Sequence, residues 1–241
     1  MTAVLDGNIA LDVPDAAQDI RSSVEAFARS LSAGSTVLDV GCGRRPYESF
    51  FTHCRYLGVD VEVSGRSEGD KQAHVFFDGR NLPFEERRFD AVVCTEVLEH
   101  AVEPLRLTEE MRRVLKPNGR LLVTVPFMWG EHEAPFDFRR FSTFGARRLL
   151  EEAGLRIVSL GKLTCGVDAI NLLVQSEICN FDAHHLAPPS STAGRWARSL
   201  GVTLARYAWA IQLRLWRRLY RFERVYIDNV IVAVPRELPP A

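Results

Sequence analysis

Short apolar runs alternate with amphipathic stretches along most of the chain. The apolar runs have the length of strands, and most lack an apolar–polar alternation, which is typical of strands covered on both faces. Seven such runs occur, at residues 36–41, 55–60, 74–78, 89–95, 119–126, 155–163 and 225–235. Apolar residues at helical spacing, with Ser, Asp or Pro at the start, predict three helices, at residues 15–31, 104–115 and 142–154.

The order of these elements predicts the fold class. Strands that alternate with helices form right-handed crossovers, and these build a parallel, doubly wound α/β sheet of Rossmann-like type. About sixty residues separate the last two strands, too many for a plain connection. We therefore expect a helical leader or lid at 1–33, a main domain at 34–165 and 225–235, and a helical insertion or cap at 166–224.

Composition adds little to this picture. Apolar residues make up 46% and charged residues 25% of the 241 residues, and the formal net charge of −1 gives no global signature of DNA or RNA binding. The five cysteines form no CxxC pair, and no apolar run reaches the length of a membrane span. The first residues lack the pattern of a signal peptide. We expect a soluble, cytoplasmic protein with reduced thiols and no DNA partner.

A glycine turn follows the first strand in TVLDVGCGRRP. Gly41 and Gly43 permit a ligand to approach backbone amides, but the loop lacks the third glycine of the GxGxxG dinucleotide pattern. Asp39 would also oppose a pyrophosphate, whereas it suits a ligand that carries an ammonium and a sulfonium group. A nicotinamide-dependent oxidoreductase is therefore disfavoured.

Two further acids follow the next two strands. Asp60 ends the second strand, where a carboxylate can accept hydrogen bonds from ribose hydroxyls. Asp78 opens the segment DGRNLPF after the third strand, where it can meet the amine of an adenine, with Leu82 near the ring. The alternative is that each acid is only a turn residue, but three acids at one edge of a sheet favour a ligand site.

Taken together, the segments DVGCG, GVD, DGRNLPF, FDAVVCTEVLEH and RVLKPNGRLLVTVP resemble the class I S-adenosylmethionine-dependent methyltransferases of the type-11 group, over about residues 34–126. The resemblance implies a seven-stranded sheet with an antiparallel last strand. Arg45 departs from the family pattern, because it stands where the third glycine of GxGxG is usual. By resemblance, the methionine part would be bound by Asp39, Gly41, Gly43 and Thr95, the ribose by Asp60, and the adenine by Asp78 and Gly79.

The fourth strand ends in TEVLEH, which places Glu96, Glu99 and His100 on one face if the chain turns helical. Two carboxylates and an imidazole are a sensible half-shell for Mg²⁺ or another divalent cation. The string also resembles the ExxEH of metal-dependent ubiquinone-pathway and small-RNA 2′-O-methyltransferases, which implies metal ligands at Glu96, Glu99, His100 and His132. Two alternatives stay open: catalytic work by His100, His132 and Glu99 without metal, or a purely structural role.

The segment HEAPFDFRR after the fifth strand mixes acids, aromatics and arginines. We expect a substrate rim with binding residues Glu133, Asp137, Arg139 and Arg140; the alternative is an ordinary salt-bridged loop. Residues 195–224 are rich in arginine, with an apolar stripe on a helical projection. We favour a helix that caps the site or packs on a second copy in a homodimer, over contact with RNA or a membrane surface.

These features predict an enzyme that uses S-adenosylmethionine to methylate a hydroxyl of a small molecule such as a natural product, a sugar or a related metabolite. A hydroxyl must lose its proton, and the histidines and acids near the fourth strand can take it. Two alternatives are an RNA 2′-O-methyltransferase, and a non-catalytic binding subunit with the same fold.

Overall fold

The computed structural model describes residues 15–67, 69, 71–184 and 223–236, and within 208–220 only Ala208, Ile211, Gln212, Leu215, Trp216, Arg218 and Tyr220. The chain divides into two compact units. One unit holds residues 16–163 and 226–241, and the other holds residues 1–15 and 164–225. The first unit contains the sheet and every predicted site residue, and the second contains the helix α4, Val167–His184.

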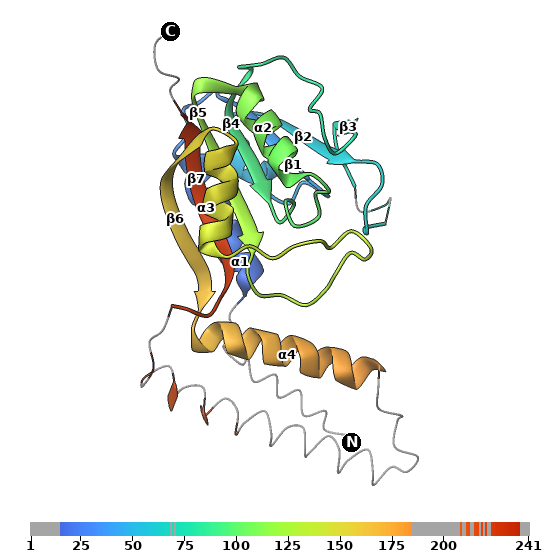
Figure 1. Ribbon diagram of the computed structural model, residues 1–241, viewed down its shortest axis with the longest axis vertical. Helices are drawn as coiled ribbons and strands as arrows, with labels where there is room; N and C mark the ends of the chain where they lie inside the picture. Colours follow the sequence, from blue (N-terminus) through green and yellow to red (C-terminus); the bar gives the residue numbers. More distant parts are fainter. Residues whose placement is uncertain are drawn as a thin grey trace, which may run out of the picture. The chain divides into compact units, whose positions relative to one another are not determined.

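In the described part of the chain, seven strands form one sheet in the order β3-β2-β1-β4-β5-β7-β6 (Figure 1). Strands β1 to β5 pair in parallel, and β7 runs antiparallel to β5. The predicted Rossmann-like sheet with an antiparallel last strand is therefore confirmed. The strands are β1 Thr36–Val40, β2 Arg55–Val61, β3 Val75–Phe77, β4 Phe89–Thr95, β5 Leu115–Pro126, β6 Leu155–Cys165 and β7 Tyr226–Pro235.

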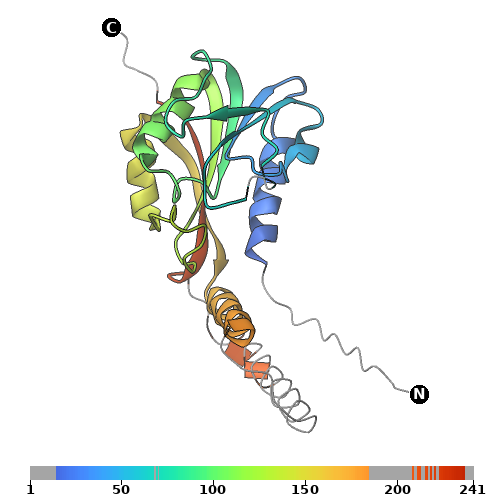
Figure 2. The same ribbon diagram turned by 90° about the vertical axis from the view of Figure 1, so that its right-hand side faces the viewer.

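Helices cover both faces of this sheet (Figure 2). Helix α1, Ala16–Arg29, lies on one face beside the short 3-10 helix η1, Glu48–Phe51. Helices α2, Pro104–Val114, and α3, Thr143–Glu152, lie on the other face. The result is a three-layer arrangement with one hydrophobic core on each side of the sheet.

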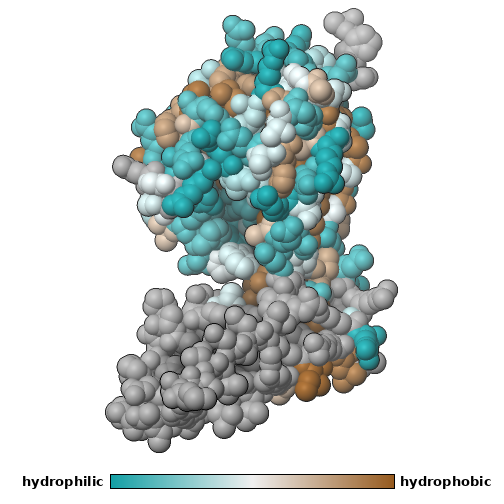
Figure 3. All heavy atoms as spheres, turned by 180° about the vertical axis from the view of Figure 1, so that it is seen from behind, coloured by the Kyte–Doolittle hydropathy of each residue, from teal (hydrophilic) through white to brown (hydrophobic). Residues whose placement is uncertain are grey.

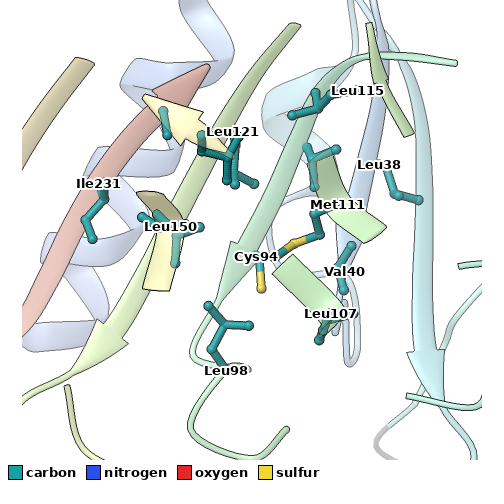
Figure 4. Packing of buried hydrophobic residues seen from close by; sticks show 14 of the residues in the cluster. Leu38, Val40, Cys94, Leu98, Leu107, Met111, Leu115, Leu121, Leu150 and Ile231 are labelled. Atoms are coloured by element: carbon teal, nitrogen blue, oxygen red, sulfur yellow. The ribbon is translucent and has the colours of Figure 1, made fainter. Parts of the chain in front are cut away.

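The two cores explain why the central strands are apolar throughout. Along β1, Leu38 and Val40 point into the core under α2 and α3, while Val37 points into the core under α1. Successive side chains of a strand point to opposite faces, so a strand covered on both sides needs apolar residues at every position. Figure 4 shows the first of these cores, with Met111 of α2 among the strand residues.

The ends of two helices follow local signals. The Ser142 side chain caps α3 by accepting a hydrogen bond from the Gly145 amide at 3.1 Å, and Gly154 after the helix has a φ of +82°. Helix α2 ends at Val114, one residue before its predicted end. The larger difference is that β5 begins directly at Leu115, whereas the prediction began this strand at Gly119. The sheet register shifts between Phe89 and Ala91, so the segment KPNG is an irregularity within β5 instead of a loop before it.

The predicted arginine-rich helix at 195–224 lies outside the described residues apart from the isolated positions named above. In the described segments, no helix is long and apolar enough to cross a membrane. Figure 3 shows the face opposite to that of Figure 1, where the first unit presents a largely hydrophilic surface with small apolar patches.

Strand β7 returns from a distant part of the sequence to lie between β5 and the edge strand β6, so its packing tests the fold. Ile231 of β7 is fully buried between helices and strands, whereas Val158 of the edge strand β6 is 52% exposed. We expect Ile231→Ala to lower the free energy of unfolding by about 2–5 kcal/mol. The matched change Val158→Ala should cost less than about 0.5 kcal/mol. Urea denaturation of both variants measures this, and equal losses would contradict the described position of β7.

Candidate active site

The glycine turn after β1 is held open by backbone geometry. Gly41 has a φ of +74°, and its amide and that of Cys42 both donate to the Val59 carbonyl, at 2.8 and 3.0 Å. A Cβ at position 41 would lie 2.2 Å from a methyl group of Val97, so only glycine fits. Arg45, the departure from the family pattern, keeps a left-handed φ of +57°, as a glycine would. The turn therefore survives without the third glycine.

Two acids anchor the backbone around this turn. Asp60 accepts a hydrogen bond from the Gly43 amide at 2.8 Å, which ties the ends of β1 and β2 together. Asp39 is almost fully buried and accepts a hydrogen bond from the Tyr56 hydroxyl at 2.5 Å. Burial raises the pKa of Asp39 to about 7. A cationic ligand beside Asp39 would favour its charged form.

Asp78 shapes the turn after β3. Its carboxylate accepts hydrogen bonds from the amides of Arg80 at 2.8 Å and Asn81 at 2.6 Å. The Asn81 amide is the main reason why the pKa of Asp78 falls to about 2. Leu82 is buried in the core under α2 and is not among the residues that line the neighbouring cavity, so its place near the adenine ring stays a prediction.

These turns surround two cavities at the carboxyl edge of the parallel strands. One, of about 440 Å³, is lined by Asp60, Asp78, Gly79 and His100, and the other, of about 530 Å³, by Asp39, Gly43, Thr95 and Glu96. Gly41 lines both cavities. The structure thus brings all seven residues predicted to bind the cofactor to one place, as the carboxyl ends of parallel strands require.

Beside the first cavity lies a group of protonatable side chains with unused hydrogen-bonding capacity. Glu99 has no exposed surface, and neither of its carboxylate oxygens has a hydrogen-bond partner among the described residues. The His100 Nε2 atom, 3.7 Å from a Glu99 oxygen, also lacks a hydrogen-bond partner there. The His100 and His132 rings lie 4.7 Å apart. One donor atom each from Glu99, His100 and His132 lies within 4.8 Å of the others.

Backbone contacts fix the orientation of the His100 ring. Its Nδ1 atom lies 2.9 Å from the carbonyl oxygen of Phe136, which can only accept a hydrogen bond. Nδ1 must therefore carry the proton in the neutral ring, and Nε2 keeps the free lone pair. The lone pair needed for a base or a metal ligand thus belongs to the nitrogen nearest Glu99. Burial, and then the neighbouring Glu96, raise the pKa of Glu99 well above its usual range.

Glu96 does not join this group. It has a left-handed φ of +54°, and its carboxyl lies beside Thr124 of β5 and Asp228 of β7. Burial raises the pKa of Glu96 to about 7 and that of Asp228 to about 8, and the mutual repulsion of the two carboxylates contributes at Asp228. Asp228 was not among the predicted site residues. An acid inside the apolar run YIDNVIVAVP was the sequence feature that could have identified it.

The predicted substrate rim is largely paired within itself. Arg140 donates two hydrogen bonds to Asp137, at 2.5 and 2.8 Å, and this pairing lowers the pKa of Asp137. Asp137 also accepts from the His132 amide at 2.9 Å, which holds that histidine near His100. Arg139 donates to the backbone carbonyl of Ala101 at 2.6 Å. These pairs give the rim a rigid frame.

A contact across the cavity connects this rim to the loop after β2. Arg66 donates a hydrogen bond to Glu133 at 2.5 Å, and Glu133 lies 4.0 Å from His100 Nε2. A Cβ at Gly65 would lie 1.9 Å from the Glu133 carbonyl oxygen, so the two backbones touch. The loop that borders Asp60 and the rim that borders His100 therefore meet directly.

Comparison with known proteins decides the family. A family model described as a methyltransferase domain matches residues 14–160, more than half of the chain. The chain belongs to the methyltransferase-domain family. The resemblance to class I S-adenosylmethionine-dependent methyltransferases, inferred above from five segments, is thereby confirmed.

Curated members of this family share part of the chain. A tRNA (carboxymethyluridine(34)-5-O)-methyltransferase of Arabidopsis thaliana is 36% identical over 42% of this chain and 26% of its own length. A probable tRNA methyltransferase 9B of Mus musculus is 34% identical over 42% of this chain and 24% of its own length. The chain thus spans about a quarter of the length of these relatives. An uncharacterised methyltransferase of Mycolicibacterium gilvum is 27% identical over 85% of this chain and 78% of its own length.

Solved structures of other proteins share the fold. A phosphoethanolamine N-methyltransferase 2 of Haemonchus contortus, solved with S-adenosylmethionine, has a TM-score of 0.52 at 19% identity and covers 90% of this chain and 52% of its own. The [4+2]-cyclase SpnF has a TM-score of 0.55 at 20% identity, with coverage of 91% and 82%. At these identities the likeness extends to the fold alone, so function must be argued from the site.

The contact between Asp60 and the glycine turn makes a prediction for this methyltransferase domain. We expect Asp60→Ala to weaken the binding of S-adenosylhomocysteine by at least about tenfold, because charge-assisted hydrogen bonds are worth about 1.5–3 kcal/mol. Asp60→Asn keeps an oxygen for the Gly43 amide and should lose less affinity. Isothermal titration calorimetry measures both, and unchanged affinity in Asp60→Ala would overturn the role predicted for this residue.

The carboxyl pair of Glu96 and Asp228 predicts a pH dependence of stability. Both groups hold their proton more tightly in the folded state, with pKa values of about 7 and 8, than in an unfolded chain. Folding therefore takes up protons between pH 4 and pH 8, so stability should fall as the pH rises through this range. We expect the melting temperature of Asp228→Asn to fall less over this range than that of the natural chain, by at least about 3 °C.

Differential scanning calorimetry from pH 5 to pH 8 measures this difference. The surface variant Glu85→Gln is the matched control, since Glu85 is exposed, and it should keep the pH profile of the natural chain. The same slope in Asp228→Asn and the natural chain would show that the buried pair does not take up the proton.

Proposed function

We propose that this protein transfers the methyl group of S-adenosylmethionine to a hydroxyl oxygen of a small molecule. The observation that carries the proposal is the free lone pair of His100 Nε2: His100 lines the first cavity, and this nitrogen lies 3.7 Å from a buried Glu99 oxygen that has no hydrogen-bond partner in the described structure. A hydroxyl acceptor must lose a proton during transfer, and a fixed lone pair at the cavity wall can accept it.

The cofactor placement belongs to the same proposal. Asp60 would hold the ribose hydroxyls, Asp78 and Gly79 the adenine, and Asp39, Gly41, Gly43 and Thr95 the methionine part. These residues divide between two cavities that share Gly41 in their linings, which supports this placement. The sulfonium would then lie near Gly41, and His100 lines the first cavity.

Bound S-adenosylmethionine supplies a methyl carbon that the sulfonium has already activated. The acceptor oxygen forms the new bond to this carbon, the carbon–sulfur bond breaks, and its electrons stay on sulfur. His100 Nε2 takes the hydroxyl proton, and the imidazolium that forms would favour the charged form of the neighbouring Glu99, which would stabilise it in turn. The Phe136 carbonyl keeps the ring oriented, so positioning and proton transfer are the work of this chain.

The same residues fit a divalent cation. Glu99 offers two unpartnered oxygens and His100 a free nitrogen with its other nitrogen held by a carbonyl, as is usual for metal-ligating histidines. His132 offers a third donor within reach. A metal held by these three residues would lower the pKa of the acceptor hydroxyl. Glu96, the fourth predicted ligand, would have to leave Asp228 to join them.

A second candidate is an RNA hydroxyl or carboxyl acceptor. Its support is that two relatives are named as tRNA methyltransferases, and one name places the methyl group on an oxygen. A similar structure, at 18% identity and a TM-score of 0.55, was solved in complex with the Trm112 methyltransferase activator of Haloferax volcanii. For an RNA substrate, an activator protein of this kind would be the partner to test.

The proposal predicts a loss of turnover without a loss of cofactor binding. We expect His100→Ala and Glu99→Gln to lower the rate of methyl transfer by at least about 100-fold, the usual contribution of a general base. The affinity for S-adenosylhomocysteine should stay within about threefold of the natural value, less than 1 kcal/mol. Glu131→Gln changes an exposed acid of the same rim and is the matched control.

The assay offers radiolabelled S-adenosylmethionine with catechols, phenols, sugars, amines and tRNA, each with Mg²⁺ or with a chelator. Transfer to hydroxyl compounds that His100→Ala abolishes supports the proposal, and loss of transfer with the chelator assigns the cluster to a metal. Transfer to amines or tRNA alone would refute it. Failure of S-adenosylhomocysteine to bind would remove methyl transfer altogether.

A further inference from the structure

A third cavity with a charged lining lies at the opposite ends of the strands from the candidate active site. It has a volume of about 310 Å³ and lies where β5 begins and β7 ends, near the arrowhead of β7 in Figure 1. The turn before β4 and the last turn of α2 form its remaining walls. Among the described residues its charged lining consists of one acid, Glu86, and four arginines, Arg87, Arg112, Arg113 and Arg236.

One of these arginines is already neutralised. Arg113 donates to both carboxylate oxygens of Glu110, at 2.7 and 2.8 Å, and to the carbonyl of Phe84 at 2.8 Å. The side chains of Arg87, Arg112 and Arg236 form no ion pair with a described residue. The Arg112 Nε atom is buried and has no acceptor in the described structure. This atom packs beside Gly154, outside the cavity lining, so it is the positive charge of the Arg112 guanidinium group, not its Nε donor, that bears on a ligand in the cavity.

The carbonyls at the end of α2 are not the partners of these arginines. Arginines near a helix end often serve the last carbonyls and the helix dipole. Here the carbonyl oxygens of Arg112, Arg113 and Val114 already accept hydrogen bonds from the amides of Leu115, Arg87 and Arg88. The capping is therefore complete in the backbone, and the three unpaired guanidinium groups remain available.

We propose that this cavity binds a phosphate group, as the free ion or as the phosphorylated end of a small metabolite. Phosphate offers several acceptor oxygens and a double negative charge, which suits planar guanidinium donors better than a single carboxylate does. Leu115, Pro117 and Pro235 in the lining would contact the organic part of an ester. The site is independent of methyl transfer, because it lies at the other ends of β4 and β5.

The test measures the melting temperature of the full chain against inorganic phosphate at constant ionic strength, with chloride as the reference ion and S-adenosylhomocysteine present throughout. We expect a saturable rise of about 5–10 °C at a hundred times the dissociation constant. Arg112→Gln and Arg236→Gln should each weaken binding by at least about tenfold, because each removes charge-assisted hydrogen bonds. Arg148→Gln, whose side chain on α3 is 86% exposed, is the matched control and should bind as the natural chain does.

Glycerol 3-phosphate in place of phosphate distinguishes the two sources of the group. Tighter binding of the ester identifies a phosphorylated metabolite, and equal binding identifies the free ion. The absence of a saturable shift overturns the proposal, as does an equal shift in the natural chain and the double variant Arg112→Gln/Arg236→Gln. Calorimetric titration of phosphate into Arg236→Gln, which changes an exposed residue, gives the result even if Arg112→Gln does not fold.

Discussion

The close contact of Gly41 with Val97 is the constraint on which both halves of the site depend. A Cβ at position 41 would overlap a Val97 methyl group, so the glycine turn after β1 packs directly on the segment after β4. The glycine turn lines the two cavities at the carboxyl ends of the strands, and the segment after β4 carries Glu99 and His100. Gly41 itself lines both cavities. If S-adenosylmethionine binds as proposed, this close packing would bring an acceptor group near the methyl group, and proximity supplies much of the rate in such a displacement.

Burial of acidic side chains at the carboxyl ends of the parallel strands lowers the stability of the fold, but it also suits these groups to bind a ligand. Asp39, Glu96, Glu99 and Asp228 all have pKa values raised by burial, and the two oxygens of Glu99 lack partners in the described structure. Desolvated carboxylates without partners are costly, and they are tolerated where a cationic or protonated ligand completes them. A sulfonium, a metal ion or an acceptor proton would each relieve this cost. The site is thus incomplete by itself, which is what a binding site for such groups requires.

Local patterns predicted the strands and the cofactor edge, because continuous apolar runs and strand-end acids need no knowledge of distant residues. Local patterns could not predict contacts between segments that lie far apart in the sequence. Asp228 reaches Glu96 only through the antiparallel register of β7 against β5, and Arg66 meets Glu133 only because two loops cross the same cavity. The start of β5 was missed for a related reason: Pro and Asn–Gly signal a turn locally, whereas pairing with β4 makes Leu115 part of the sheet.

The formal net charge of −1 conceals an uneven distribution of acidic and basic side chains between the two ends of the strands. Acids gather where the parallel strands end, and arginines gather where β4 and β5 begin. A sheet has only a small dipole, so this separation of charge comes from the side chains at the two ends of the strands and not from the backbone. Acids outnumber arginines by five to three in the linings of the two cavities at the carboxyl ends, and arginines outnumber acids by four to one in the cavity where β4 and β5 begin. A total near zero therefore excludes neither cationic nor anionic ligands, and the sign of each cavity, not the sum, decides what the protein can bind.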